Sequence, residues 1–589
     1  MHVNALDWSV VATSIIICFI PALFFLRKGN QNTTEFFASG RAAPWWLIGV
    51  SMVATTFSTD TPNLVTNFVR TGGVAANWQW WAFLLTGMAT VFFYARMWRR
   101  SGVLTDLEFY ELRYSGRAAS WVRGFRALYL GLMFNCFIMA TVNLAAAKIA
   151  NIVLGWPMWQ TLLICAGLNV VFASISGLWG VLVIDFIQFG VAMTGAFAVA
   201  IFALRQPEIA GLHGLIARLP PGTLNLLPDF RQWDVTLAVF IIPLTVQWWS
   251  VWYPGAEPGG GSYIAQRMLA ARSEGDALGG TLLFNVAHYA LRSWPWIVVA
   301  LASLIIFPTL DSIQTAFPGV NPHLLGHDMA YPAMLKFLPH GFLGLMLGAM
   351  EAAYRSTIMT HLNWGSSYLV HDFWRRFVRR DATERHYVFV ARVCTALLMV
   401  LAALLTFELD NAKQAFDLIL SIGAGTGLLY LLRWFWWRIN AWCEIAAMVS
   451  SFVVAVAFFV AARHGAAAST PTVLLTNIAI TTLVWVVTAF LAPATDRATL
   501  EAFYRKVRPA GPGWSAIRRK AGLAPSPDSL PQALLAWTAG CLMVYGALFG
   551  IGSVLYGRTA IATFWIVVAC AGAAVLVRLM PQWWRSTGG

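Results

Sequence analysis

The chain has 589 residues, of which 59% are hydrophobic and 11% are charged, and its mean hydropathy is +0.65. A soluble protein carries about twice that proportion of charged residues, so these values exclude a water-soluble fold and indicate a chain dissolved in a bilayer. The formal net charge is +14. It does not indicate a nucleic-acid partner, because the basic residues lie between apolar runs, as they do in membrane proteins.

About fifteen apolar runs reach the length of about twenty residues that a helix needs to cross a bilayer. They lie near 8–26, 46–70, 77–97, 121–150, 158–177, 180–204, 234–265, 275–308, 338–370, 387–408, 414–437, 440–463, 472–492, 533–555 and 560–580. None alternates every second residue as a barrel strand does, so the sequence predicts an all-α polytopic membrane protein. The distribution of Lys and Arg over the loops predicts a cell inner-membrane protein with a periplasmic N terminus and a cytoplasmic C terminus.

Two of these runs are interrupted. The second changes from apolar residues at Trp45–Ala54 to hydroxyls, an acid and a proline at Thr55–Asn63. The seventh contains two prolines and four glycines between Trp248 and Tyr263. Such breaks are costly in lipid unless they line a cavity, and a matched pair of them predicts a transporter binding site.

The breaks lie five spans apart, so spans two to six and seven to eleven are predicted to be inverted repeats. The expected organisation is a first span with the loop after it, a first repeat, a periplasmic loop, a second repeat, additional spans, a cytoplasmic basic linker, and C-terminal spans with a tail. The corresponding ranges are 1–45, 46–204, 205–233, 234–437, 438–492, 493–532 and 533–589.

Four stretches resemble, in the same order, the motifs of the sodium/solute symporter family, which includes the bacterial proline, sialic acid and galactose carriers. They are Thr34–Arg41, Gly180–Gln188, Tyr263–Ala271 and Ala352–Asn363, and the similarity extends over roughly 5–460. The resemblance implies a LeuT-type core of 5+5 inverted repeats with additional flanking helices. It also implies a secondary active transporter that couples inward sodium flow to uptake of a small polar organic solute by alternating access.

The resemblance further implies a sodium site between the second and ninth spans. Its ligands would be the backbone carbonyls of Ala54, Phe57 and Ala353 and the hydroxyls of Ser356 and Thr357. Hard oxygen ligands of this kind suit a sodium ion. Asp185, a carboxylate inside an apolar span, is expected to be either a second cation or proton site or a structural hydrogen-bond anchor.

The chain departs from the family pattern at Arg355, where a small or apolar residue is usual. Glu351 lies one helical turn earlier, so a structural Glu351–Arg355 ion pair is predicted. Without that pair, a cation beside the sodium ligands would weaken ion binding by charge repulsion. Coupling to protons therefore stays open as an alternative to coupling to sodium.

The substrate pocket is expected to be formed by acids, polar groups and aromatic rings near the two breaks: Asp60, Thr61, Asn63, Trp80, Glu257, Tyr263 and His288. Two acids among aromatic rings suit a cationic or zwitterionic solute, and they also suit a polyol, since sugars stack on aromatic faces and form hydrogen bonds with carboxylates. Solute, sodium and membrane lipid are the expected partners of a monomer or weak dimer, with no nucleic acid. The sequence does not identify the solute.

Two other classes of protein have less support in the sequence. A transporter-like sensor would need a signalling domain, and 493–532 is short for one. A membrane enzyme would need a catalytic cluster, but His361, His371 and Asp372 are spread over several turns of one helix. Zinc, P-loop and nucleotide motifs are not found in the sequence. We therefore expect no enzyme activity and no cofactor other than the coupling ion.

Overall fold

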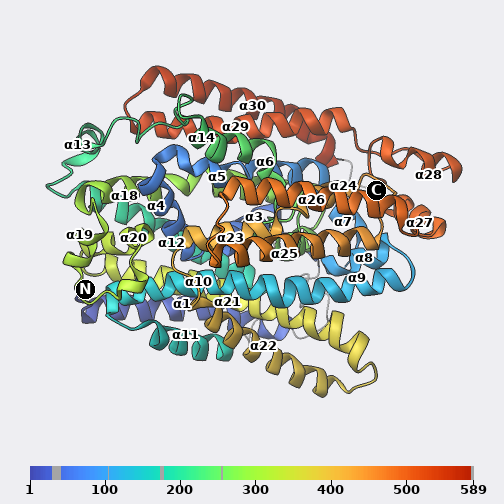
Figure 1. The fold of residues 1–589 in the computed structure, drawn as a ribbon, viewed down its shortest axis with the longest axis horizontal. Helices are drawn as coiled ribbons and strands as arrows, with labels where there is room; N and C mark the ends of the chain where they lie inside the picture. The colour runs from blue at the N-terminus through green and yellow to red at the C-terminus, as the bar shows by residue number, and fades with distance from the viewer. Residues whose placement is uncertain (30–40, 104, 173–177, 254–255, 586–589) are drawn as a thin grey trace.

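The computed structural model describes residues 1–29, 41–103, 105–172, 178–253 and 256–585. Most of its long helices run side by side along the length of the molecule (Figure 1). Within the described residues there is no β-strand, and the only bridge joins Ala43 to Ala271. Most of the first motif, Thr34–Gly40, and Pro254 with Gly255 of the second break lie outside the described residues.

Eight helical segments of the described residues are long and apolar enough to cross a membrane. They comprise α9–η5–α10 (Gly116–Leu128, Tyr129–Phe134, Asn135–Leu154), α12 (Leu178–Leu204), α17–η9–α18 (Glu274–Val286, Ala287–Leu291, Ser293–Ile306), α22 (Glu384–Thr406), α25 (Ala441–Arg463), α26 (Thr470–Leu491), α29 (Leu530–Leu555) and α30 (Thr559–Arg585).

The other predicted spans correspond to the remaining apolar helices. They correspond to α1 (Ala5–Gly29), α5–α7 (Trp78–Trp81, Leu84–Ala89, Ala95–Ser101), α11 (Met158–Phe172), α21 (Phe342–Ser367) with η13 (Tyr368–Val378), α23 (Ala412–Gly423), α24 (Gly427–Leu432), and the two broken spans. Among them, α5–α7 and the two broken spans are interrupted by polar or π-helical turns.

Both predicted breaks are confirmed. The second span consists of α3 (Trp45–Thr55) and α4 (Asp60–Gly72), which are separated by four residues. The seventh consists of α14 (Trp233–Thr236), η6 (Leu237–Ile241), α15 (Ile242–Thr245) and η7 (Gln247–Trp249), and the next α-helix after the break is α16 (Ser262–Ala270).

Glycine is required in the second break for two reasons. Gly259 and Gly260 have φ of 86° and 85°, a conformation that side chains other than glycine rarely adopt. A Cβ at Gly259 would also lie 2.8 Å from the ring of Tyr94. On its other side the break is held by α23, because Val251 N donates to Gly423 O at 3.1 Å. The break is therefore a packed segment inside the bundle.

The loops lie at the two ends of the bundle (Figure 1). One end carries the N terminus, α13 (Gly211–Arg218) and α19 (Leu310–Ala316), and the other carries α8 (Phe109–Arg113), α27 (Arg497–Val507) and α28 (Ser515–Lys520). The basic linker packs onto the core there: Trp514 is fully buried, and its Nε1 donates to Trp434 O at 2.8 Å. The hairpin α29–α30 flanks α6 and η9.

Candidate functional site

A cavity lies where the two breaks meet. It is lined from the first break and α4, from α10, from the second break and α16, from α21 and from α23: Thr55, Thr56, Ser58, Asp60, Thr61, Leu64, Ile138, Thr141, Val142, Trp252, Tyr253, Tyr263, Thr357, His361, Ala412, Phe416 and Ile419. Its volume is about 70 Å³, or room for roughly five water molecules at about 15 Å³ each. The lining side chains must therefore move apart to admit an organic solute.

The residues predicted to bind sodium belong to α3, to the first break and to α21, and one of the five lines this cavity. Thr357 lines it, and its Oγ1 donates to Ala353 O at 2.9 Å. Ala54 and Phe57 are buried at the first break, and Phe57 N donates to Ala54 O at 3.0 Å. The hydroxyl of Thr357 and the unwound backbone of the first break thus border one space.

Asp185 is fully buried on α12 and is surrounded by hydrogen-bond donors. Ser51 Oγ donates to its Oδ2 at 2.6 Å, Thr55 Oγ1 to the same oxygen at 3.3 Å, and Ser356 Oγ to Oδ1 at 3.2 Å. Arg267 Nη2 lies 3.6 Å from Oδ2. The guanidinium therefore supplies a positive charge at Asp185, and this geometry favours the structural-anchor interpretation of the carboxylate.

Arg355, which departs from the family pattern, lies beside Glu351 as predicted. Arg355 Nη2 lies 3.4 Å from Glu351 Oε2, one turn earlier on α21. The acid compensates the charge of the guanidinium, so the repulsion that would weaken binding of a cation at Ser356 and Thr357 is reduced.

Three of the residues predicted to bind substrate line the cavity: Asp60, Thr61 and Tyr263. Asp60 is the first residue of α4. Tyr263 stacks on Tyr253 with a ring-centroid distance of 6.2 Å and an interplanar angle of 15°. Trp252 packs against Tyr253 at 4.4 Å. The cavity therefore combines one carboxylate, several hydroxyls and a wall of aromatic rings.

Three others lie away from the cavity lining. Trp80 and His288 are buried behind the first break, where Arg292 Nη2 lies 2.7 Å from His288 Nδ1 and the Trp80 and His288 rings are 5.8 Å apart. Asn63 is fully buried on α4, and neither atom of its amide has a hydrogen-bond partner in the described part of the chain. The sequence shows that these residues are close to a break, but it does not show whether their side chains face the cavity.

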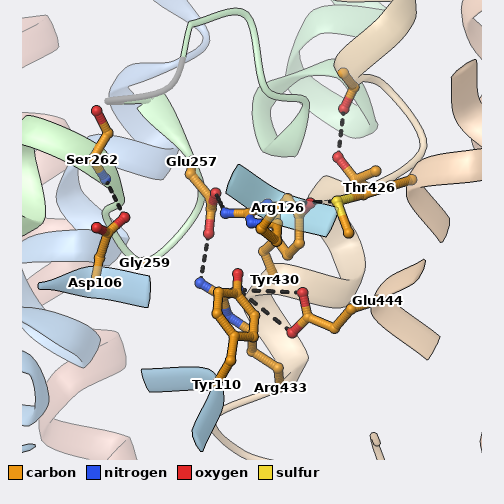
Figure 2. Close-up of polar contacts among 12 residues, drawn as sticks. Asp106, Tyr110, Arg126, Glu257, Gly259, Ser262, Thr426, Tyr430, Arg433 and Glu444 are labelled. Atoms are coloured by element: carbon orange, nitrogen blue, oxygen red, sulfur yellow. Dashed lines mark hydrogen bonds and ion pairs between the residues drawn. The ribbon is translucent and has the colours of Figure 1, made fainter. Parts of the chain in front are cut away.

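Glu257 differs most from its predicted role. Its two carboxylate oxygens are bonded to Arg126 Nη2 and to Arg433 Nη2, the latter at 2.5 Å (Figure 2). Arg433 Nη1 also lies 3.5 Å from Glu444 Oε2 and donates to Tyr110 OH at 2.7 Å. All four charged side chains are at most 2% exposed. Both oxygens of Glu257 are therefore engaged with guanidinium groups, and Glu257 is not among the residues that line the cavity.

Several lining residues were not predicted, among them Thr56, Thr141, Tyr253 and His361. Thr56 and Tyr253 belong to the breaks, so their position in the sequence was a sufficient signal. Thr141 and His361 lie within long continuous helices, α10 and α21. Nothing local distinguishes them from polar residues that satisfy a neighbouring carbonyl.

The model of the sodium:solute symporter family matches residues 36–453. The chain belongs to this family. As a sodium:solute symporter it is a membrane transporter and not an enzyme, and it couples solute uptake to sodium. The sequence-based predictions of family, of function class and of an all-α membrane fold are therefore confirmed.

Among its relatives, the sodium/glucose cotransporter of Vibrio parahaemolyticus is 26% identical over 446 residues, which cover 72% of this symporter and 79% of the relative. The mouse sodium/myo-inositol cotransporter is 24% identical over 77% of this chain and 66% of its own. A solved sodium-coupled sialic acid symporter superposes with a TM-score of 0.62 at 17% identity, over 84% of this chain and 99% of that one. This last likeness confirms the LeuT-type fold.

Proposed function

We propose that this symporter carries a neutral polyhydroxylated solute, a sugar or cyclic polyol, together with sodium bound by the carbonyls of Ala54, Phe57 and Ala353 and the hydroxyls of Ser356 and Thr357. The observation that carries the proposal is that Thr357 and Asp60 line one cavity with the aromatic rings of Trp252, Tyr253, Tyr263 and Phe416. The ion site and the solute site would then border the same cavity, and binding of one would favour binding of the other.

The chemistry of the cavity supports a polyol over a cation or a zwitterion. Aromatic rings such as Tyr253 and Tyr263 offer flat apolar faces, while Asp60 and the threonine hydroxyls accept and donate hydrogen bonds. The second predicted acid, Glu257, is neutralised by Arg126 and Arg433, so it does not add negative charge for a cationic solute. Relatives that carry glucose and myo-inositol agree with this choice.

We further propose that one sodium ion moves per cycle. The guanidinium of Arg267 lies 3.6 Å from the Asp185 carboxylate. It neutralises that carboxylate, so no second sodium ion is needed there. The end of the bundle that carries α27 and α28 is proposed to be cytoplasmic, because Lys and Arg concentrate there. The N terminus would then be periplasmic in a cell inner membrane.

Uptake into proteoliposomes tests the proposal. Radiolabelled D-glucose and myo-inositol should accumulate under an inward sodium gradient and not under an equal potassium gradient. Ser356→Ala with Thr357→Ala should raise the sodium concentration needed for half-maximal uptake about tenfold or more, because two ligand oxygens are lost. The matched control is Thr395→Ala on α22, whose hydroxyl only donates to Ala391 O. An unchanged sodium requirement in the double variant would remove both residues from the ion site.

A further inference from the structure

His361 is a polar cavity residue with no assigned role. It lies on α21 one turn beyond Thr357, and its ring lines the same cavity. Tyr263 meets the ring edge-on at a centroid distance of 5.9 Å, and Trp364 meets it at 6.0 Å. The imidazole thus contacts two aromatic rings and belongs to a residue of the cavity lining.

Asn135 determines how this ring is presented. Asn135 Nδ2 donates to Gly131 O at 3.2 Å and to His361 O at 2.8 Å. Because carbonyl oxygens only accept, these contacts fix the amide orientation and leave Oδ1 facing His361 Nδ1 at 2.6 Å. Oδ1 also only accepts, so Nδ1 carries the proton. In the neutral imidazole Nε2 is then an acceptor, and it has no hydrogen-bond partner in the described part of the chain.

Two features of α10 and α21 allow the contact between Asn135 and His361. Asn135 follows the π-helical turn η5, whose extra residue shifts the register of α10, and such turns recur at functional sites. A Cβ at Gly365 would lie 2.2 Å from Asn135 Nδ2 and 2.7 Å from Gly131 O. Glycine at 365 therefore lets α21 approach closely enough for the amide to bridge both helices.

We propose that His361 Nε2 accepts a hydrogen bond from a hydroxyl of the transported solute and that Asn135 is its positioning residue. This inference rests on the proposed function, because it deepens the polyol specificity of the same cavity. Asp60 offers a carboxylate acceptor elsewhere in that cavity. Two fixed acceptors select solutes with hydroxyl donors at two positions and reject analogues that lack one, because a buried acceptor would then stay unpaired.

The test compares two isosteric variants in sodium-driven uptake of D-glucose and myo-inositol. His361→Asn keeps an amide where Nδ1 lies but nothing where Nε2 lies, so KM should rise about tenfold. His361→Gln reaches the Nε2 position with an acceptor and should restore KM to within about threefold of the wild type. The sodium concentration for half-maximal uptake, measured at saturating solute for each variant, should stay unchanged in both, because reciprocal coupling shifts it only where solute is below saturation.

Two further measurements separate solute contact from a merely structural role. Asn135→Leu should raise KM in the wild-type background and have no additional effect in His361→Asn, because it acts through the ring. One monodeoxyglucose should show the same tenfold weaker uptake on the wild type and no further weakening on His361→Asn.

The outcomes are distinguishable. Wild-type uptake with an unchanged KM in His361→Asn, or a change in maximal rate alone, would overturn the inference and leave the proposed function standing. Wild-type protein that takes up neither probe would overturn the polyol proposal and this inference together. Sodium-induced thermal stabilisation, measured without solute, identifies variants that are folded.

Discussion

Replacing Glu257 by glutamine should destabilise the protein although the side-chain volume hardly changes. The carboxylate is 1% exposed and contacts two guanidinium groups. Its neutralisation leaves Arg126 and Arg433 with Glu444 alone, a buried cluster of net charge +1. Breaking a buried ion pair from one side costs about 3–5 kcal/mol. At about 2.1 cal/mol/K per residue the chain unfolds with an entropy of at most about 1.2 kcal/mol/K, so Tm should fall by at least about 2.5 °C.

The assay is thermal unfolding of purified protein in detergent, followed by intrinsic tryptophan fluorescence. Glu501→Gln is the matched control, because Glu501 pairs with Arg497 in a solvent-exposed i,i+4 contact that contributes less than about 1 kcal/mol. Arg126→Gln combined with Glu257→Gln restores a neutral cluster and should recover part of the loss. If Glu257→Gln melts within the error of Glu501→Gln, the buried network does not stabilise the second break as reasoned.

Three other predictions are also tested by thermal unfolding. Arg267→Met leaves the buried Asp185 carboxylate without a cation and should lower Tm, and adding Asp185→Asn should recover stability; a lack of recovery would contradict the pairing. Gly427→Ala would place a Cβ 1.5 Å from Trp249 O and should lower the free energy of unfolding by about 3 kcal/mol through overpacking. The control is Gly190→Ala, where the added Cβ has nothing within 4 Å and should be neutral or stabilising by up to about 1 kcal/mol. Equal Tm values for the two variants would refute the close approach at Gly427. Sodium at 100 times its wild-type Kd should stabilise the wild type by about 2.7 kcal/mol, seen as a rise in Tm that potassium does not produce. Ser356→Ala with Thr357→Ala, at the tenfold weaker binding expected above, should reduce this stabilisation to about 1.4 kcal/mol at the same sodium concentration. An equal rise with potassium would exclude a specific site.

Much of the fold could be predicted because lipid imposes simple constraints on sequence. A polar or proline-rich interruption of an apolar run costs free energy at that depth, so Thr55–Asn63 and the glycine-rich segment before Ser262 signal unwound backbone locally. The structure has both breaks where those residues stand. The Glu351–Arg355 pair was predictable for the same reason, since its spacing of four residues fixes the contact within one helix.

The direction in which a side chain points could not be predicted in the same way. Glu257 is 131 residues from Arg126 and 176 from Arg433, so nothing near Glu257 in the chain reveals that it is neutralised. The orientation of His361 depends on Asn135, 226 residues away, and on the register shift made by η5. One π-helical turn moves every later residue of a span around the helix axis, and the hydrophobic pattern does not record it.

The guanidinium of Arg267 beside Asp185 has an energetic consequence for the cell. A charge that stays with the protein through the cycle takes nothing from the ion gradient. With one travelling sodium, a tenfold concentration ratio contributes about 1.4 kcal/mol and a membrane potential of 100 mV about 2.3 kcal/mol. Their sum limits the concentration ratio of the solute to about 500-fold, and a second travelling ion would square that figure.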